Sequence, residues 1–124
     1  MHRNETPGLP NLLFICSRNR LRSPTAEAVF GNIDGVETMS AGLAADADCG
    51  VSPDMLAWAD VIFVMEPVHG RKLSRGFGPH LRGKRVVCLN VPDDYAYMDD
   101  RLVALLWEIV PRSVPALRAA RPGR

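Results

Sequence analysis

Three short apolar runs constrain the fold of this chain more than any other feature of its sequence. They are Leu12 to Cys16 (LLFIC), Val61 to Met65 (VIFVM) and Val86 to Val91 (VVCLNV). None of them alternates apolar with polar residues, as a strand with one face in solvent does. We therefore expect three strands buried on both faces, as in a parallel sheet covered by helices. A weaker strand is expected at residues 36–40 (VETMS).

Helix-start signals separate these runs. Ser23-Pro24 and Ser52-Pro53 each offer an N-cap followed by proline at the first helical position. Residues 68–73 are expected to form one or two helical turns. Asp99 or Asp100 precedes a stretch whose apolar residues recur at helical spacing, and this last helix is expected to end at Pro111.

The alternation of strands and helices predicts an α/β fold with three α/β/α layers around a four-stranded parallel sheet. The chain has 124 residues, of which 47% are apolar and 23% charged, which fits one soluble domain with one core. We expect this domain over residues 1–115, followed by a flexible tail over 116–124. The formal net charge of +1 argues against a protein that coats polyanions.

Compartment and cofactors follow from what the sequence contains. No apolar run reaches the roughly 18 residues that a membrane helix requires, and the opening residues hold no apolar leader. Cys16, Cys49 and Cys88 are widely spaced without a CxxC pair, which makes a poor disulfide framework and an incomplete zinc site. We expect a cytoplasmic protein with free thiols, no membrane contact, no metal and no other cofactor.

The segment after the first apolar run, CSRNRLRS, places Cys16 and Arg22 with five residues between them. In a parallel sheet this loop falls at the carboxyl ends of the strands, where ligands bind. Five residues let the backbone curl with its N–H groups inward, and the next helix adds positive partial charge. Arg22 would bind phosphate oxygens with its planar guanidinium, and Cys16 as a thiolate would be a nucleophile directed at phosphorus. The alternative is a small buried cysteine that merely ends a strand.

Two acidic residues follow the third apolar run. Cleavage of a phosphate ester needs a carboxylic acid that reaches over the loop from another strand end. Asp93 and Asp94 lie at that edge of the predicted sheet. The alternative is that both are solvated turn residues after Pro92.

Residues 11–110 resemble low-molecular-weight protein tyrosine phosphatases in several blocks that follow the family's order. LLFICSRNRLRSPTAEAVF resembles its opening strand, Cys-x5-Arg-Ser loop and helix. Ser40-Ala41-Gly42, residues 60–66 (DVIFVME) and Asp93-Asp94-Tyr95 resemble its Ser-Ala-Gly, its third strand with Met-Asp, and its Asp-Pro-Tyr, and Asp99 resembles a later aspartate. The resemblance implies a metal-independent phosphomonoester hydrolase that works through phosphocysteine.

The same resemblance implies a role for each matching residue. Cys16 corresponds to the nucleophile, Arg22 to the phosphate-binding arginine, and Asp93 to the general acid, with Asp94 as the alternative. Ser40 corresponds to a loop-supporting residue that partners the loop asparagine. Substrate contacts are implied for the remaining loop residues and one aromatic residue, namely Ser17, Arg18, Asn19, Arg20, Leu21, Ser23 and Tyr95.

The sequence also departs from the family. Leu21 replaces its second loop cysteine, so Cys49 is the candidate for resolving an oxidised Cys16. Arg18, in place of glycine, and Arg20 either form a solvated rim or contact a second anionic group. The segment before residue 60 is shorter and lacks the aromatic residue of the pocket wall, so Tyr95 and Tyr97 are expected to hold a phenyl ring.

The expected partner is a phosphorylated substrate, either a phosphotyrosine protein or a small or nucleotide phosphomonoester. Phosphate, sulfate or vanadate would bind at the same site. Two alternatives remain open. Arsenate reductases share the fold but need relay cysteines, and a non-catalytic phosphate- or phosphoprotein-binding module would need no general acid.

Overall fold

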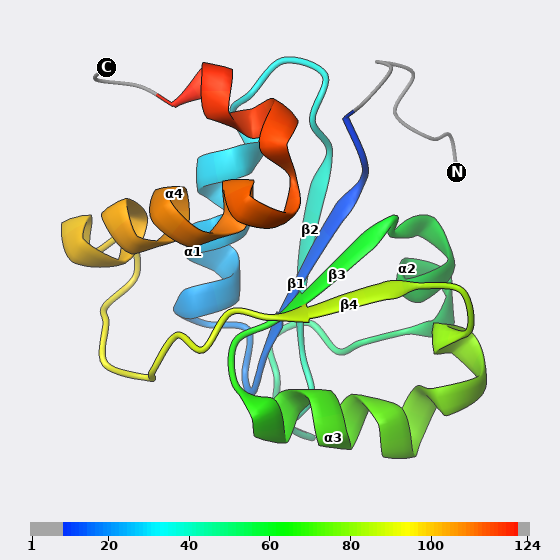
Figure 1. The fold of residues 1–124 in the computed structure, drawn as a ribbon. Coiled ribbons are helices and arrows are strands. Elements are labelled where there is room, and N and C mark those ends of the chain that lie inside the picture. The colour runs from blue at the N-terminus through cyan, green and yellow to red at the C-terminus, as the bar shows by residue number, and fades with distance from the viewer. Residues whose placement is uncertain (1–8, 122–124) are drawn as a thin grey trace.

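A parallel four-stranded sheet lies between two layers of helices in the computed structural model, which describes residues 9–121 (Figure 1). Its strands are β1 (Leu12–Cys16), β2 (Thr38–Gly42), β3 (Val61–Val64) and β4 (Arg85–Cys88), in the spatial order β2-β1-β3-β4. Helices α1 (Arg22–Gly31) and α4 (Asp100–Ser113) cover one face. Helices α2 (Pro53–Trp58) and α3 (Pro67–Phe77) cover the other. The predicted fold class is confirmed.

The two central strands explain why their sequences are wholly apolar. Alternate residues of β1 face opposite helix layers: Phe14 packs in the α1 and α4 layer, whereas Ile15 packs in the α2 and α3 layer. The Phe14 ring stacks on Phe30 and Phe63, with centroid distances of 5.9 and 5.2 Å. Because β1 and β3 are covered on both faces, every one of their residues is buried.

Strand β4 differs from the prediction. It is short, its only partner strand among residues 9–121 is β3, and it leaves Arg85, Val86 and Cys88 exposed. The sequence run is apolar, but its strand lies at the edge of the sheet instead of inside it. Beyond the strand, Leu89 and Val91 are buried, and their N–H groups donate to the carbonyls of Val64, the last residue of β3, and of Met65, which follows it. This continuation carries the following residues to the carboxyl edge of the sheet.

Lys84 and Arg85, at the start of β4, each bind the end of a helix. Lys84 Nζ donates to the carbonyl oxygens of Ala57 and Ala59, at 2.9 and 2.7 Å, where α2 ends. Arg85 Nη1 donates to the carbonyl oxygen of Ser113, at 2.7 Å, where α4 ends. The open edge of the sheet is therefore tied to both helix layers.

Two of the predicted helix starts agree with the structure and one does not. Ser52 caps α2 by accepting a hydrogen bond from the Met55 N–H, and Asp99 is the N-cap of α4. By contrast, α1 begins at Arg22, two residues before the predicted Pro24, because the Ser23 hydroxyl is bonded within the preceding loop. The third helix, α3, runs for eleven residues and is longer than predicted.

The C-terminal region is more ordered than the sequence suggests. Helix α4 continues two residues past Pro111, and residues 115–120 form a 3-10 helix, η2 (Pro115–Ala120). Leu117 in η2 is only 1% exposed and packs into the core. A single apolar anchor thus holds much of the segment expected to be a tail. Residues 122–124 of that expected tail lie outside the described residues. Over residues 9–121, no helix combines the length and apolar character needed to cross a membrane.

Candidate active site

The loop between β1 and α1 forms a cradle of backbone N–H groups. The carbonyl oxygens of Cys16, Ser17 and Arg18 accept hydrogen bonds from the N–H groups of residues 43, 44 and 48, at 3.1, 2.7 and 3.0 Å. A trans peptide directs its N–H away from its carbonyl, so the next N–H groups point to the inner side of the loop. Among residues 9–121, the backbone N–H groups of residues 17–21 have no hydrogen-bond partner. These donors match the anion cradle expected from the sequence.

Two backbone features shape this cradle. Asn19 has φ of +56°, a left-handed conformation that asparagine tolerates better than most residues, and it turns the loop inward. Gly42 pairs with Cys16 across the sheet. A Cβ atom on Gly42 would lie 2.6 Å from the Ser17 carbonyl oxygen and 2.9 Å from the Arg18 carbonyl carbon. Only glycine lets β2 approach the loop this closely.

Cys16 lies at the base of the cradle and is 3% exposed. Its Sγ is 2.9 Å from the Ser23 Oγ, which also lies 2.9 Å from the Asn19 Oδ1. The hydroxyl has one proton, so it can donate to a thiolate or to the amide oxygen, but not to both at once. The expected pairing of Asn19 with Ser40 is replaced, because Ser40 donates to Glu27 Oε1 at 2.6 Å.

Arg22 is held by residues that follow strands β3 and β4. Its side chain is 4% exposed, and Nη1 donates to Glu66 Oε2 at 2.5 Å and to the Val91 carbonyl oxygen at 2.8 Å. Its Nε lies 3.7 Å from Asp93 Oδ1, while the Asp93 side chain is 66% exposed. The ends of β3 and of the segment after β4 therefore fix the guanidinium beside the cradle.

A cavity of about 650 Å³ opens above the loop. The structure brings Cys16 and Arg22 of the loop together with Asp93, which lies about 70 positions later in the sequence. Its lining consists of loop residues, two residues from other helices and loops, and the acid, namely Cys16, Ser17, Arg18, Arg20, Leu21, Arg22, Ala44, Lys72 and Asp93. Lys72, from α3, had no predicted role, and no ion pair within residues 9–121 involves it.

The tyrosines do not line this cavity. The Tyr95 ring lies beneath Arg101, whose Cζ is 5.4 Å from the ring centroid, and Tyr97 is exposed. Asp94 is absent from the lining as well. Asp99 caps α4, and the hydrogen bond from the Arg101 side chain holds the pKa of Asp99 below its ordinary value. The lining of this cavity includes neither tyrosine, and a contact of Tyr95 with the substrate stays a prediction.

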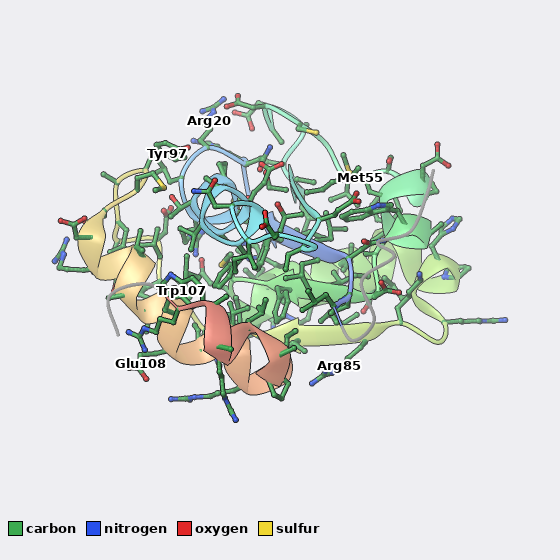
Figure 2. The ribbon with its side chains drawn as sticks, turned by 90° about the horizontal axis from the view of Figure 1, so that it is seen from above. Arg20, Met55, Arg85, Tyr97, Trp107 and Glu108 are labelled. Carbon is green, nitrogen blue, oxygen red and sulfur yellow. The ribbon has the colours of Figure 1, made fainter. Side chains whose placement is uncertain are left out.

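The arginines at the rim are paired with acidic residues. Arg20 is labelled in Figure 2, and its Nε lies 3.2 Å from Asp48 Oδ1 while its Nη2 donates to the Asp46 carbonyl oxygen at 3.2 Å. Arg18 Nε lies 3.6 Å from Asp46 Oδ2. The short loop over residues 43–48 thus offsets the rim charge. Of the two alternatives for Arg18 and Arg20, the structure favours a solvated, paired rim.

Two residues that the sequence reasoning missed contact both ends of the loop. His69, in the first turn of α3, is 1% exposed and its Nε2 lies 3.0 Å from the Ser17 Oγ. Its Nδ1 accepts a hydrogen bond from the Glu66 N–H at 3.0 Å, and Glu66 binds Arg22. Burial, and secondarily the charge of Arg22, lower the pKa of His69 below 6.5. The signal was present: Glu-Pro-x-His directly after a buried strand is typical of a helix start at a sheet's carboxyl edge.

Cys49 and Cys16 are separated by strand β2, so they lie two inter-strand spacings apart across the sheet. The Cys49 carbonyl accepts from the Gly42 N–H, and Gly42 pairs with Cys16 on one side and with Gly50 on the other. Two strand spacings amount to roughly 10 Å, more than the Cα separation that a disulfide spans. Resolution of an oxidised Cys16 by Cys49 would therefore require this segment to move. No cluster of His, Cys, Asp and Glu within residues 9–121 could hold a metal ion.

Solved structures with the same architecture provide the comparison. The YwlE arginine phosphatase from Geobacillus stearothermophilus superposes with a TM-score of 0.67 at 19% identity, covering 90% of this chain and 94% of its own. The Wzb tyrosine phosphatase from Escherichia coli K30, in complex with phosphate, gives 0.66 at 24% identity, covering 86% and 97%. The tyrosine phosphatase AmsI from Erwinia amylovora gives 0.63 at 22% identity, covering 98% and 95%. Neither family models nor curated proteins match the sequence. The chain therefore has the fold of the low-molecular-weight tyrosine phosphatases, as its sequence blocks predicted.

Proposed function

We propose that the chain is a phosphomonoester hydrolase that works through a phosphocysteine intermediate on Cys16. One observation carries this proposal: a buried cysteine, a buried arginine and an exposed aspartate meet at one cavity above a loop of free N–H donors. Structures of the same fold bind phosphate, sulfate and benzylphosphonate, all of which are tetrahedral oxyanions. An anion of that shape suits this cradle.

The first chemical step transfers the phosphoryl group to sulfur. The N–H groups of residues 17–21 and the guanidinium of Arg22 bind the three non-bridging oxygens. The Cys16 thiolate attacks phosphorus while protonated Asp93 donates its proton to the departing ester oxygen. An S–P bond forms, the P–O bond breaks, and the alcohol leaves.

The second step returns the enzyme to its starting state. The Asp93 carboxylate takes a proton from water, and that water attacks phosphorus. The S–P bond breaks, inorganic phosphate leaves, and the Ser23 hydroxyl turns from Asn19 to donate to the restored thiolate. The 2.9 Å separation of the Ser23 Oγ from the Cys16 Sγ supports this role.

Asp93 is a better general acid than Asp94. Asp93 lines the cavity and its Oδ1 lies 3.7 Å from the Arg22 Nε, whereas Asp94 is not among the lining residues. A bound phosphate would take the place of the carboxylate against Arg22 and leave Asp93 free to face the ester oxygen.

The cavity lining favours no particular alcohol. Without an aromatic wall it offers no stacking partner to a phenyl ring, so we propose a general phosphorylated substrate class, including small phosphomonoesters as well as phosphoproteins. Arsenate reduction needs relay cysteines near the nucleophile, and the cysteine placement does not favour it. Cys49 lies two inter-strand spacings from Cys16, and Cys88 lies on the exposed edge strand.

The test is hydrolysis of p-nitrophenyl phosphate in the presence of a metal chelator. Cys16→Ser should abolish turnover, and Cys88→Ser, which changes an exposed thiol, should leave it intact. Asp93→Asn should slow phenyl phosphate more than p-nitrophenyl phosphate, because the poorer leaving group depends more on the acid.

Rapid quenching adds direct evidence about the intermediate. Mass spectrometry of the quenched Asp93→Asn variant should find phosphate on the peptide that contains Cys16. Turnover that survives in Cys16→Ser would contradict the mechanism. Binding of vanadate by a wild-type protein that does not hydrolyse either ester would favour the non-catalytic binding module.

A further inference from the structure

His69 and Glu66 together link the first and last residues of the phosphate loop to one helix start. Ser17 opens the loop and contacts the His69 ring, and Arg22 closes it and contacts the Glu66 carboxylate. Glu66 is the N-cap of α3, and its side chain also accepts the backbone N–H of His69. The two loop ends, Ser17 and Arg22, therefore share a single support.

The hydrogen bonds determine the protonation state of the ring. Since the Glu66 N–H donates to Nδ1, that nitrogen has a free lone pair, and the proton of the neutral ring is on Nε2. Nε2–H then donates to the Ser17 Oγ. A proton added at Nδ1 would oppose the Glu66 N–H and break the capping arrangement.

The surrounding charges act on this ring from three elements. Arg22 from α1 and Lys72 from α3 disfavour a protonated ring, whereas Glu66 and Asp93 favour one. Burial is the largest influence, and together with Arg22 and Lys72 it keeps the pKa of His69 below its ordinary value, so the ring is neutral at neutral pH. The neutral ring is the form that the geometry requires.

We infer that His69 is a positioning residue that, as a neutral hydrogen-bond donor to Ser17, holds the phosphate loop in its anion-binding shape. It acts through Ser17 and Glu66 and does not line the cavity itself. Helix α3 has a separate apolar anchor in the buried Leu73, so its docking on the sheet does not depend on the His69 ring alone. The inference rests on the proposed function for its activity readout only.

Binding of sulfate tests the inference without catalysis. Sulfate keeps its charge between about pH 5 and 7.5, so a change in its affinity reports on the protein's own groups. His69→Phe keeps a flat ring of similar size but removes both hydrogen bonds, and His80→Phe, which changes an exposed histidine, is the matched control. The affinity of each variant is expressed relative to wild type at the same pH.

We expect His69→Phe to bind sulfate more weakly than wild type at pH 7.5, and the difference should narrow once the pH is low enough to protonate the wild-type ring. Turnover of p-nitrophenyl phosphate should fall by up to about 100-fold in kcat/KM, the order produced by a displacement of 1 Å in an active site. Ser17→Ala should give a similar loss, and the double variant should lose little more than either single variant.

Two results would overturn the inference. One is a sulfate affinity of His69→Phe at pH 7.5 that equals that of wild type, and the other is full additivity of Ser17→Ala and His69→Phe. Failure of the proposed function looks different: the wild type would not hydrolyse the ester, yet His69→Phe would still bind sulfate more weakly than wild type.

Discussion

Replacement of Gly42 by alanine perturbs the phosphate loop from the neighbouring strand without touching a side chain of the site. The new Cβ would lie 2.6 Å from the Ser17 carbonyl oxygen, whereas ordinary van der Waals contact begins at 3.4 Å. The difference of about 0.8 Å must be absorbed by backbone, because the nearest atoms are the loop itself and the Cβ of Ala47. Neither can rotate away as a flexible side chain would.

The magnitude follows from that displacement. Overpacking of this kind costs roughly 1–3 kcal/mol in the free energy of unfolding. A shift approaching 1 Å in a catalytic loop costs on the order of 100-fold in rate, so Gly42→Ala should lower kcat/KM by tens of fold. The loss of activity should exceed what partial unfolding explains, because the strain falls on the cradle directly.

Gly50 provides the matched control for this substitution. It pairs with Gly42 across an isolated bridge, yet a Cβ on Gly50 would meet nothing within 4 Å. Urea unfolding, sulfate binding and p-nitrophenyl phosphate turnover should all be near wild type for Gly50→Ala and impaired for Gly42→Ala. Wild-type turnover and sulfate affinity in Gly42→Ala would refute the reasoning that β2 sets the shape of the loop.

Three further perturbations address stability, the rim and the C-terminal segment. Because burial lowers the pKa of His69 in the folded state, the unfolded chain binds the proton at a higher pH than the folded chain does. The free energy of unfolding should therefore fall as the pH drops below 6.5. Urea titrations at several pH values should show a flatter decline for His69→Gln. Asp48→Asn should release Arg20 and lower KM for nucleoside monophosphates relative to p-nitrophenyl phosphate, with a stability change below about 1 kcal/mol; an unchanged ratio of KM values would show that the arginine does not reach the substrate. Leu117→Ala should cost about 2–5 kcal/mol by urea unfolding, because the side chain is buried, whereas Val86→Ala at the exposed edge should cost far less.

Local sequence patterns predict well the parts of this fold that local interactions determine. The buried strand β1, the Ser52 cap and the Asp99 cap all follow from residues close in the chain. Strand order is not encoded locally, so the apolar run at β4 gave no sign that it lies at an edge. Ser23 shows the opposite failure: a good local N-cap is used instead for contacts within the loop, and the helix begins at Arg22.

The candidate site divides in the same way. Cys16 and Arg22 lie on one short loop, and Asp93 follows a strand that must end at the same edge, so their meeting was foreseeable. Glu66 and His69 contact loop residues that are 44 and 52 positions away, and neither distance nor orientation can be derived from spacing alone. The packing of the Tyr95 ring against Arg101 is likewise a matter of side-chain direction that spacing does not predict.

Lys84 and Arg85, at the start of β4, attach this edge strand to the helices through hydrogen bonds and not through buried side chains. Adjacent residues of a strand point to opposite faces, so Lys84 reaches the end of α2 on one side and Arg85 reaches the end of α4 on the other. A positive side chain at a helix C-terminus also complements the partial negative charge there. The exposed side chains of Val86 and Cys88 are therefore not needed to hold β4 in place. Sequence drift at Val86 and Cys88 should be tolerated, while the two positions before them should resist change.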